Sequence, residues 1–267
     1  MSGRTGYKMY IPDEEEFESA EFVKTFKTLY FKNESVDPKI KESIGTAPNQ
    51  TVRWVEDIAD GLLSSPKLTE QDIFFIMAWK TGNIKMIELN PEPKDVEDVP
   101  GDSYSSGWRI KDLAVSLRGS KKDDENSFAK FAEKIVDHQG ELRVAAKYSV
   151  EEVLNMLVSY GRPSGIGLVY LLTLVFFLSG GDHPIYDRFA KRALDSIVFG
   201  LHPRYVAESK LPDIDWNSTS KKKAIEATSL IIKGYEQLLT RVFDDAWKTE
   251  RDIDRALWVY GHPDLLK

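Results

Sequence analysis

Residues 161–194 are the part of this chain whose residue types and spacing are best suited to chemistry. A tight glycine turn, Gly165-Ile166-Gly167, leads into a strongly apolar segment, and a single carboxylate, Asp187, follows at the start of the next helical pattern. Glycine lets a backbone approach a ligand closely, and the helix after it begins with N–H groups that have no intrahelical acceptor. Such a turn can donate hydrogen bonds to a phosphate.

Both features also have a structural interpretation. A Gly-Ile-Gly turn can simply join two helices, with Ile166 as an apolar plug. An aspartate at a helix start, such as Asp187, is a common N-cap that accepts backbone N–H groups. Because a lone GxG is a weak signal for phosphate binding, the order and spacing of the parts carry more information than either part alone.

That order resembles the core of the helix-hairpin-helix DNA glycosylases, the superfamily of the 8-oxoguanine and adenine glycosylases. In the family a Leu-Pro-Gly-Val-Gly hairpin leads into an apolar helix, and a segment similar to Pro-Ile-Leu-Asp opens the next helix with the catalytic aspartate. The 20 positions from Gly167 to Asp187 match the family's spacing. The matching segments here are Ser164-Gly165-Ile166-Gly167, residues 168–178 and Pro184-Ile185-Tyr186-Asp187.

The resemblance implies a role for Asp187. As a base leaves its sugar, positive charge develops on the sugar, and a fixed carboxylate stabilises it. The implied partner is double-stranded DNA with the target base flipped out of the stack. Strand-cleaving members carry a Lys two residues after the second glycine, where this chain has Val169, which cannot form a Schiff base. We therefore expect a monofunctional glycosylase that uses water as its nucleophile.

Cations and aromatic residues complete the predicted site. The hairpin residues, together with four cations that flank it, are expected to meet the DNA backbone, which supplies most of the affinity of such complexes. A solvated charged face is the alternative for these cations. Trp79 and Lys80, at the end of an apolar helical pattern, are candidates for the base pocket with Tyr186, although a Lys in the last turn is also what the helix dipole favours. The four cations are Arg162, Arg188, Lys191 and Arg192.

Two further groups of cations could either take part in binding or have a purely structural role. Lys221-Lys222-Lys223 would oppose the dipole of the helix that it begins, which is easier to explain with an anion nearby, although exposure to solvent is sufficient. Arg251 and Arg255 can equally form internal ion pairs.

The composition is that of a globular protein, with 42% apolar and 30% charged residues. A net charge of −7 counts against a surface that is positive throughout, but it allows a local basic groove. The absence of Cys excludes disulfides, thiolate zinc sites and cysteine-ligated clusters, and it is typical of a cytoplasmic protein. The N-terminal residues do not resemble a signal peptide, and the apolar run 166–178 is shorter than the roughly 20 residues of a membrane span.

The four His show no metal-ligand spacing, so we expect no metal and no cofactor. Because the apolar run is too short to span a bilayer, we also expect no membrane partner. The sequence does not indicate the oligomeric state.

The hydrophobic periodicity predicts helices nearly throughout, with no alternating pattern strong enough for a sheet. Thr69 is a predicted N-cap, Ser149 and Glu152 form a predicted capping box, and residues 88–107 are predicted to be a long acidic loop. The predicted helices span residues 16–30, 52–63, 70–80, 108–117, 127–136, 150–160 and 168–178, a segment opened by Asp187, a long helix after residue 220 and a last one over 250–260.

The helical patterns predict an all-α fold, and the resemblance implies the two-lobed architecture of the helix-hairpin-helix DNA glycosylases. One lobe comprises residues 69–199 with the hairpin and Asp187, and the other comprises 1–68 with 200–267. The active-site cleft is expected between them. The leading function is removal of a damaged or mispaired base. A nucleic-acid-binding module without catalysis and a protein-interaction module on the same scaffold remain alternatives.

Overall fold

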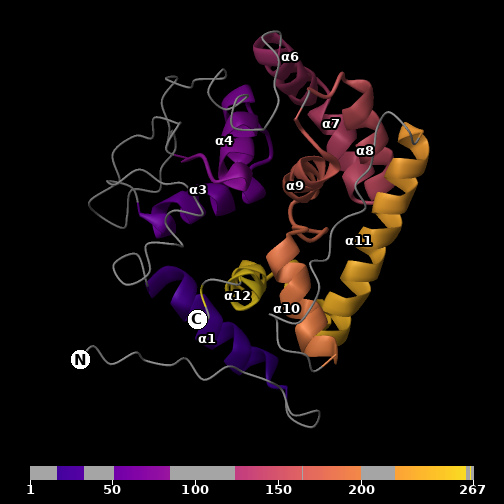
Figure 1. Cartoon of the computed structure of the whole chain (residues 1–267). Coiled ribbons are helices and arrows are strands. Elements are labelled where there is room, and N and C mark those ends of the chain that lie inside the picture. Colours follow the sequence, from indigo (N-terminus) through magenta and orange to yellow (C-terminus); the bar gives the residue numbers. More distant parts are fainter. Residues whose placement is uncertain are drawn as a thin grey trace. The chain divides into compact units, whose positions relative to one another are not determined.

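The structure is a computed structural model that describes residues 17–32, 51–84, 124–163, 165–199, 220–262 and 265. Every regular element in these ranges is helical, which confirms the all-α prediction for the described part of the chain (Figure 1). The predicted helix over 108–117 and the predicted acidic loop over 88–107 lie outside the described residues.

The chain forms two compact units whose bounds differ from those of the predicted lobes. Unit 1 comprises Met1–Asp37 and Pro184–Lys267, and unit 2 comprises Pro38–His183. Helix α3 (Val52–Ser64) therefore belongs with the hairpin in unit 2, whereas α10 (Arg188–Phe199) belongs with the C-terminal helices in unit 1. The reason is helix packing, since α3 is hydrogen-bonded to α4 and α10 lies directly against α12.

Unit 2 is built around an apolar helix, α9 (Leu168–Ser179), which contacts α3, α4, α7 and α8. Ten of its twelve residues are buried, so it has no polar face. Gln139, the first residue of α7, is hydrogen-bonded to the backbone of Leu68. Its side-chain oxygen accepts the Leu68 N–H at 2.7 Å, and its side-chain nitrogen donates to the Leu68 carbonyl at 3.0 Å. The remaining helices are α4 (Glu70–Thr81), α6 (Asp124–Asp137), α7 (Gln139–Ala146) and α8 (Val150–Ser159).

Local side-chain caps explain where two of these helices begin. The Thr69 hydroxyl accepts the Asp72 N–H, and the Asp72 carboxylate accepts the Thr69 N–H, so the predicted N-cap is confirmed as a full capping box. Burial outweighs these hydrogen bonds and raises the pKa of Asp72. The Ser149 hydroxyl accepts the Glu152 N–H at 3.2 Å, which confirms the predicted start of α8.

Unit 1 is organised around α12 (Arg251–Gly261), against which α1 (Ser19–Lys32) and α10 pack (Figure 1). Aromatic rings fill the contact with α1: Phe22 and Phe26 lie 5.3 and 5.0 Å from Tyr260, centroid to centroid, in edge-to-face geometry. The unit also contains α11 (Lys221–Phe243) and the short 3₁₀ helix η2 (Asp244–Lys248).

The contact between α12 and α10 depends on a glycine. A Cβ atom on Gly261 would clash with the backbone carbonyl of Phe189, at 2.7 Å from its carbon, and would lie 3.0 Å from the Ala193 nitrogen. Both neighbours are helix backbone, which cannot move aside as a flexible side chain can. The backbones of α10 and α12 are therefore as close here as a residue without a side chain permits.

We expect Gly261→Ala to destabilise unit 1 by about 3 kcal/mol, because the two helices must separate to admit one methyl group. Gly234→Ala in α11 is the matched control, since a Cβ there meets nothing within 4 Å. Alanine is the better helix former by about 0.5–1 kcal/mol, so the control variant should be slightly more stable than the wild type. Urea unfolding measures both, and equal stabilities would contradict the close approach.

Candidate functional site

The hairpin lies in unit 2 at the start of α9. Gly165 has a φ of +84°, a conformation that favours glycine, and Ile166 is fully buried beneath the turn. Gly167 is the N-cap of α9 and offers no side chain to its first N–H groups, and a Cβ there would meet nothing within 4 Å. Ile166 is therefore the apolar plug considered above, while Gly167 leaves open space beside the first turn of the helix.

Arg162 stabilises this turn from within. Its guanidinium donates a hydrogen bond to the Ile166 carbonyl, and burial lowers its pKa. The side chain is half-buried, so one of the four predicted phosphate cations also serves to hold the hairpin.

Asp187 lies in unit 1, half-buried at the start of α10. Its Oδ1 accepts the Phe189 N–H at 2.8 Å, and its carbonyl accepts the Lys191 N–H at 2.9 Å. The carboxylate thus acts as a helix cap, as the structural interpretation predicted. A cap and a stabiliser of positive charge are compatible roles, because a carboxylate has two oxygens and several acceptor positions.

The charge of Asp187 also affects the pKa of a buried tyrosine of unit 1, Tyr235. Burial raises the pKa of Tyr235 well above its ordinary value, and the charges of Asp254, Asp187 and Asp195 add to this effect. Tyr186 is buried with its ring 5.4 Å from that of Tyr235. This predicted pocket residue is therefore part of the core of unit 1.

The three predicted phosphate cations of α10 differ in their surroundings. Arg188 is exposed, with its guanidinium 4.6 Å from the centre of the Phe189 ring. Lys191 forms an ion pair with Asp195, and Arg192 is buried against α12, where it donates to the Gly261 carbonyl at 3.5 Å. Of this set, Arg188 is the cation most accessible to a phosphate.

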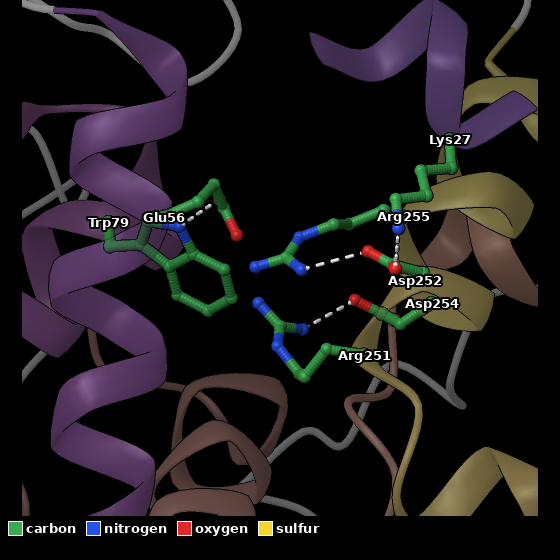
Figure 2. Close-up of polar contacts among 7 residues, drawn as sticks. All are labelled: Lys27, Glu56, Trp79, Arg251, Asp252, Asp254 and Arg255. Carbon is green, nitrogen blue, oxygen red and sulfur yellow. Dashed lines mark hydrogen bonds and ion pairs between the residues drawn. The ribbon is translucent and has the colours of Figure 1, made fainter. Parts of the chain in front are cut away.

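Trp79 and Glu56 form a buried polar contact in unit 2. The Trp79 indole N–H donates to the Glu56 carboxylate at 2.8 Å, as Figure 2 shows. The indole also meets Phe177 of α9 edge to face at 5.9 Å, so its orientation is fixed at two points. Glu56 is fully buried and Trp79 half-buried, whereas Lys80 lies half-buried in the last turn of α4.

Glu56 was not among the predicted site residues, although the sequence contains a signal for it. It lies on the apolar face of α3, among Val52, Val55 and Ala59, which are all buried. A carboxylate on such a face must be hydrogen-bonded to be tolerated, and the Trp79 N–H meets that need.

The charged residues of α12 form ion pairs within unit 1, as one of the two interpretations predicted. Asp252 accepts from Lys27 of α1 and from Arg255 at 3.1 Å, and Arg251 pairs with Asp254 at 2.9 Å (Figure 2). Burial alone would raise the pKa of Asp252, but the hydrogen bonds from Lys27 and Arg255 outweigh it and lower the pKa. Of these pairs, the one between Lys27 and Asp252 joins α1 to α12, whereas the other two lie within α12.

The chain matches no family model, no curated protein and no solved structure. Within the described ranges, no helix has the length and apolar character needed to cross a bilayer. The same residues contain no group of three or more His, Asp or Glu side chains placed to hold a metal ion.

The lowered pKa of Asp252 predicts acid sensitivity. Its carboxylate stabilises the folded chain above the ordinary Asp pKa of about 3.9, and this stabilisation is lost as the pH falls through the folded-state value. We expect the free energy of unfolding to fall further between neutral and acidic pH in the wild type than in Asp252→Asn, by on the order of 1 kcal/mol. Asp245→Asn is the control, because Asp245 forms an exposed pair with Lys248. Urea unfolding at several pH values tests this, and parallel curves for wild type and Asp252→Asn would refute it.

The Trp79–Glu56 contact predicts a graded series of stabilities. Trp79→Phe leaves the buried carboxylate without its indole donor, which costs about 1–3 kcal/mol. Glu56→Gln keeps an acceptor oxygen and should cost less than Glu56→Ala. The control is Trp247→Phe, because that indole donates to the exposed Thr240 hydroxyl at 3.0 Å, and we expect a change within about 0.5 kcal/mol. Chemical denaturation ranks the variants, and a Glu56→Gln variant no more stable than Glu56→Ala would contradict the hydrogen-bond role.

Proposed function

We propose that this chain is a monofunctional DNA N-glycosylase of the helix-hairpin-helix type that removes a damaged or mispaired base. The observation that carries the proposal is the order of three parts: the hairpin with Gly165 and Gly167, the buried helix α9 that follows it, and Asp187 at the first turn of α10. Each part has the local geometry that its proposed role requires.

The hairpin is suited to a phosphate contact. The Tyr170 and Leu171 N–H groups donate to the Gly167 carbonyl at 3.1 and 3.3 Å, so the Leu168 and Val169 N–H groups are the ones that precede the hydrogen bonds of α9. Gly167 provides no capping side chain, and the space beside it is open. A phosphate oxygen at this position would be bound by backbone dipoles at the positive end of the helix. The hydrogen bond from Arg162 to the Ile166 carbonyl and the burial of the Ile166 side chain stabilise the turn.

Asp187 is suited to the chemical step. In the proposed reaction the bond between the sugar C1′ and the base nitrogen breaks, and the base departs with the electron pair. The carboxylate stabilises the positive charge left on the sugar until water attacks C1′. The hydrogen bond from the Phe189 N–H holds the carboxylate in a fixed orientation, which is what electrostatic stabilisation needs. Val169, half-buried in the first turn of α9, provides no amine, so the reaction proceeds without a Schiff base.

A second candidate is nucleic-acid binding on the same scaffold without catalysis. Its support is that Asp187 is used as a helix cap, a role that explains the residue without any reaction. Both candidates require phosphate contacts and therefore binding that weakens with added salt. A protein-interaction scaffold would lack that dependence.

The decisive experiment incubates the chain with duplexes that each carry one lesion or mismatch and compares wild type with Asp187→Asn. Asparagine is as good an N-cap as aspartate, so the substitution removes the charge and keeps the cap. We expect abasic sites from the wild type on at least one duplex and a loss of about 100-fold or more in the variant. Asp195→Asn is the matched control, because it removes a carboxylate from the same helix that pairs with Lys191.

The outcomes separate the candidates. Salt-sensitive binding without abasic sites would leave the binding module and refute the glycosylase. Neither cleavage nor salt-sensitive binding would refute both nucleic-acid functions. Equal loss in Asp187→Asn and Asp195→Asn would show that the first variant acts through stability and not through the reaction.

A further inference from the structure

Helices α7 and α8 of unit 2 lie next to each other in the chain (Figure 1), and their surface has a groove that the proposed function does not use. Its volume is about 580 Å³, and all of its lining residues belong to these two helices and the turn between them. We call it the α7–α8 groove. The lining residues that matter for its chemistry are Glu141, Val144, Ala145, Tyr148, Glu152 and Met156.

Two large apolar side chains in the groove are exposed to water. Tyr148, in the turn after α7, is 82% exposed, and Val144, in the last turn of α7, is 61% exposed. Single exposed apolar residues are ordinary on protein surfaces. Two of them in one concave surface with a polar rim, beside the half-buried Met156, form the kind of patch that marks a protein interaction site.

The backbone around the groove is held by hydrogen bonds before any partner arrives. The N–H groups of Tyr148 and Ser149 both donate to the Ala145 carbonyl, at 3.0 and 2.9 Å, and the Ser149 hydroxyl then caps α8. Tyr148 therefore projects from a fixed turn. A preformed surface loses little conformational entropy on binding, which favours affinity.

A glycine also lines the groove. Gly140 lies in the first turn of α7, and a Cβ there would meet nothing within 4 Å. Its φ lies outside the left-handed region, so no backbone conformation requires glycine at this position. Glycine weakens a helix, and at Gly140 it leaves room for a close approach from outside.

The charge of the groove selects among partners. Glu141 and Glu152 are exposed on its rim, and the lining residues include no Lys or Arg. Glu141 lies 3.8 Å from the His138 ring nitrogen, a contact between partly exposed groups at the edge. Two carboxylates repel phosphates, so the lining of the α7–α8 groove disfavours a nucleic acid. They attract Lys and Arg side chains instead.

We propose that the α7–α8 groove binds a cationic amphipathic helix of a partner protein. The apolar face of that helix lies against Tyr148, Val144 and Met156, and its Lys or Arg side chains face Glu141 and Glu152. In helix-in-groove recognition the bound helix places apolar side chains three or four residues apart against the apolar residues of the groove, which here are Val144, Tyr148 and Met156. The proposal does not depend on the glycosylase function.

The test uses the full chain and two labelled 18-residue peptides that share a leucine face and differ in having all Lys or all Glu on the polar face. Fluorescence anisotropy measures binding. We expect saturable binding of the Lys peptide and at least tenfold weaker binding of the Glu peptide. Tyr148→Ser should weaken the Lys peptide at least tenfold, and the double variant Glu141→Gln with Glu152→Gln should weaken it and flatten its salt dependence.

A pair of glycine variants locates the site. Gly140→Leu places a side chain in the groove and should abolish binding. Gly61→Leu, on an exposed position of α3 where a Cβ also meets nothing within 4 Å, should leave binding unchanged. Both variants add the same side chain to a helix, so a difference between them reports on the groove and not on stability.

Four results would overturn the proposal. The first is binding of the Lys peptide that does not saturate. The second is binding of the Lys peptide to Tyr148→Ser and Gly140→Leu as tight as to the wild type. Either would indicate general attraction to an acidic chain. The third is equal binding of the two peptides, which removes the charge selection. The fourth is a dimer in sedimentation that Tyr148→Ser dissociates, which makes a second copy of this chain the occupant. Abasic-site formation by these variants is measured separately, so failure here and failure of the proposed function remain distinct.

Discussion

The burial of α9 is the constraint on which the proposed site depends. A helix that is apolar on nearly every side can exist only inside a shell of other helices, so its position in unit 2 is fixed. Its first turn then holds the hairpin at the edge of that shell, with Ile166 as the anchor. Its other end stops at Gly180 and Gly181, both at positive φ, and the His183 ring lies 2.7 Å from the Ala146 carbonyl. The chain therefore leaves unit 2 from a defined point four residues before Asp187.

Most helices could be predicted from the sequence because their signals are local. The Thr69 and Ser149 side chains each cap a helix by accepting the backbone N–H of the residue three positions later. The apolar periodicity predicts which face of each helix is buried. Helix α7 was not predicted as a separate element, because His138 at its start makes no side-chain cap and no glycine or proline separates it from α6. The bounds of the units could not be predicted either. They depend on contacts between distant segments, such as that between Gly261 and the backbone at Phe189.

The difference between local signals and contacts between distant segments also explains which parts of the candidate site could be predicted from the sequence. The cap formed by Asp187 and the plug formed by Ile166 are consequences of residues near them in the chain. The environment of Arg192 is not, since α12 covers the face of α10 on which it lies. The Trp79–Glu56 contact likewise joins two helices, and no local pattern pairs them. Side chains whose partners are remote in sequence become interpretable only once the helices are assembled.

Four cations of unit 1 form ion pairs with aspartates of the same unit, which bears on how an acidic chain could bind DNA in the proposed function. These cations are Lys27, Lys191, Arg251 and Arg255. Affinity that rests on many free cations releases many counterions and falls steeply with salt. In the proposed function the hairpin adds backbone N–H groups, which would bind a phosphate through fixed dipoles. A net charge of −7 is therefore compatible with the proposed DNA binding, in which the hairpin supplies backbone contacts and exposed cations such as Arg188 supply the salt dependence.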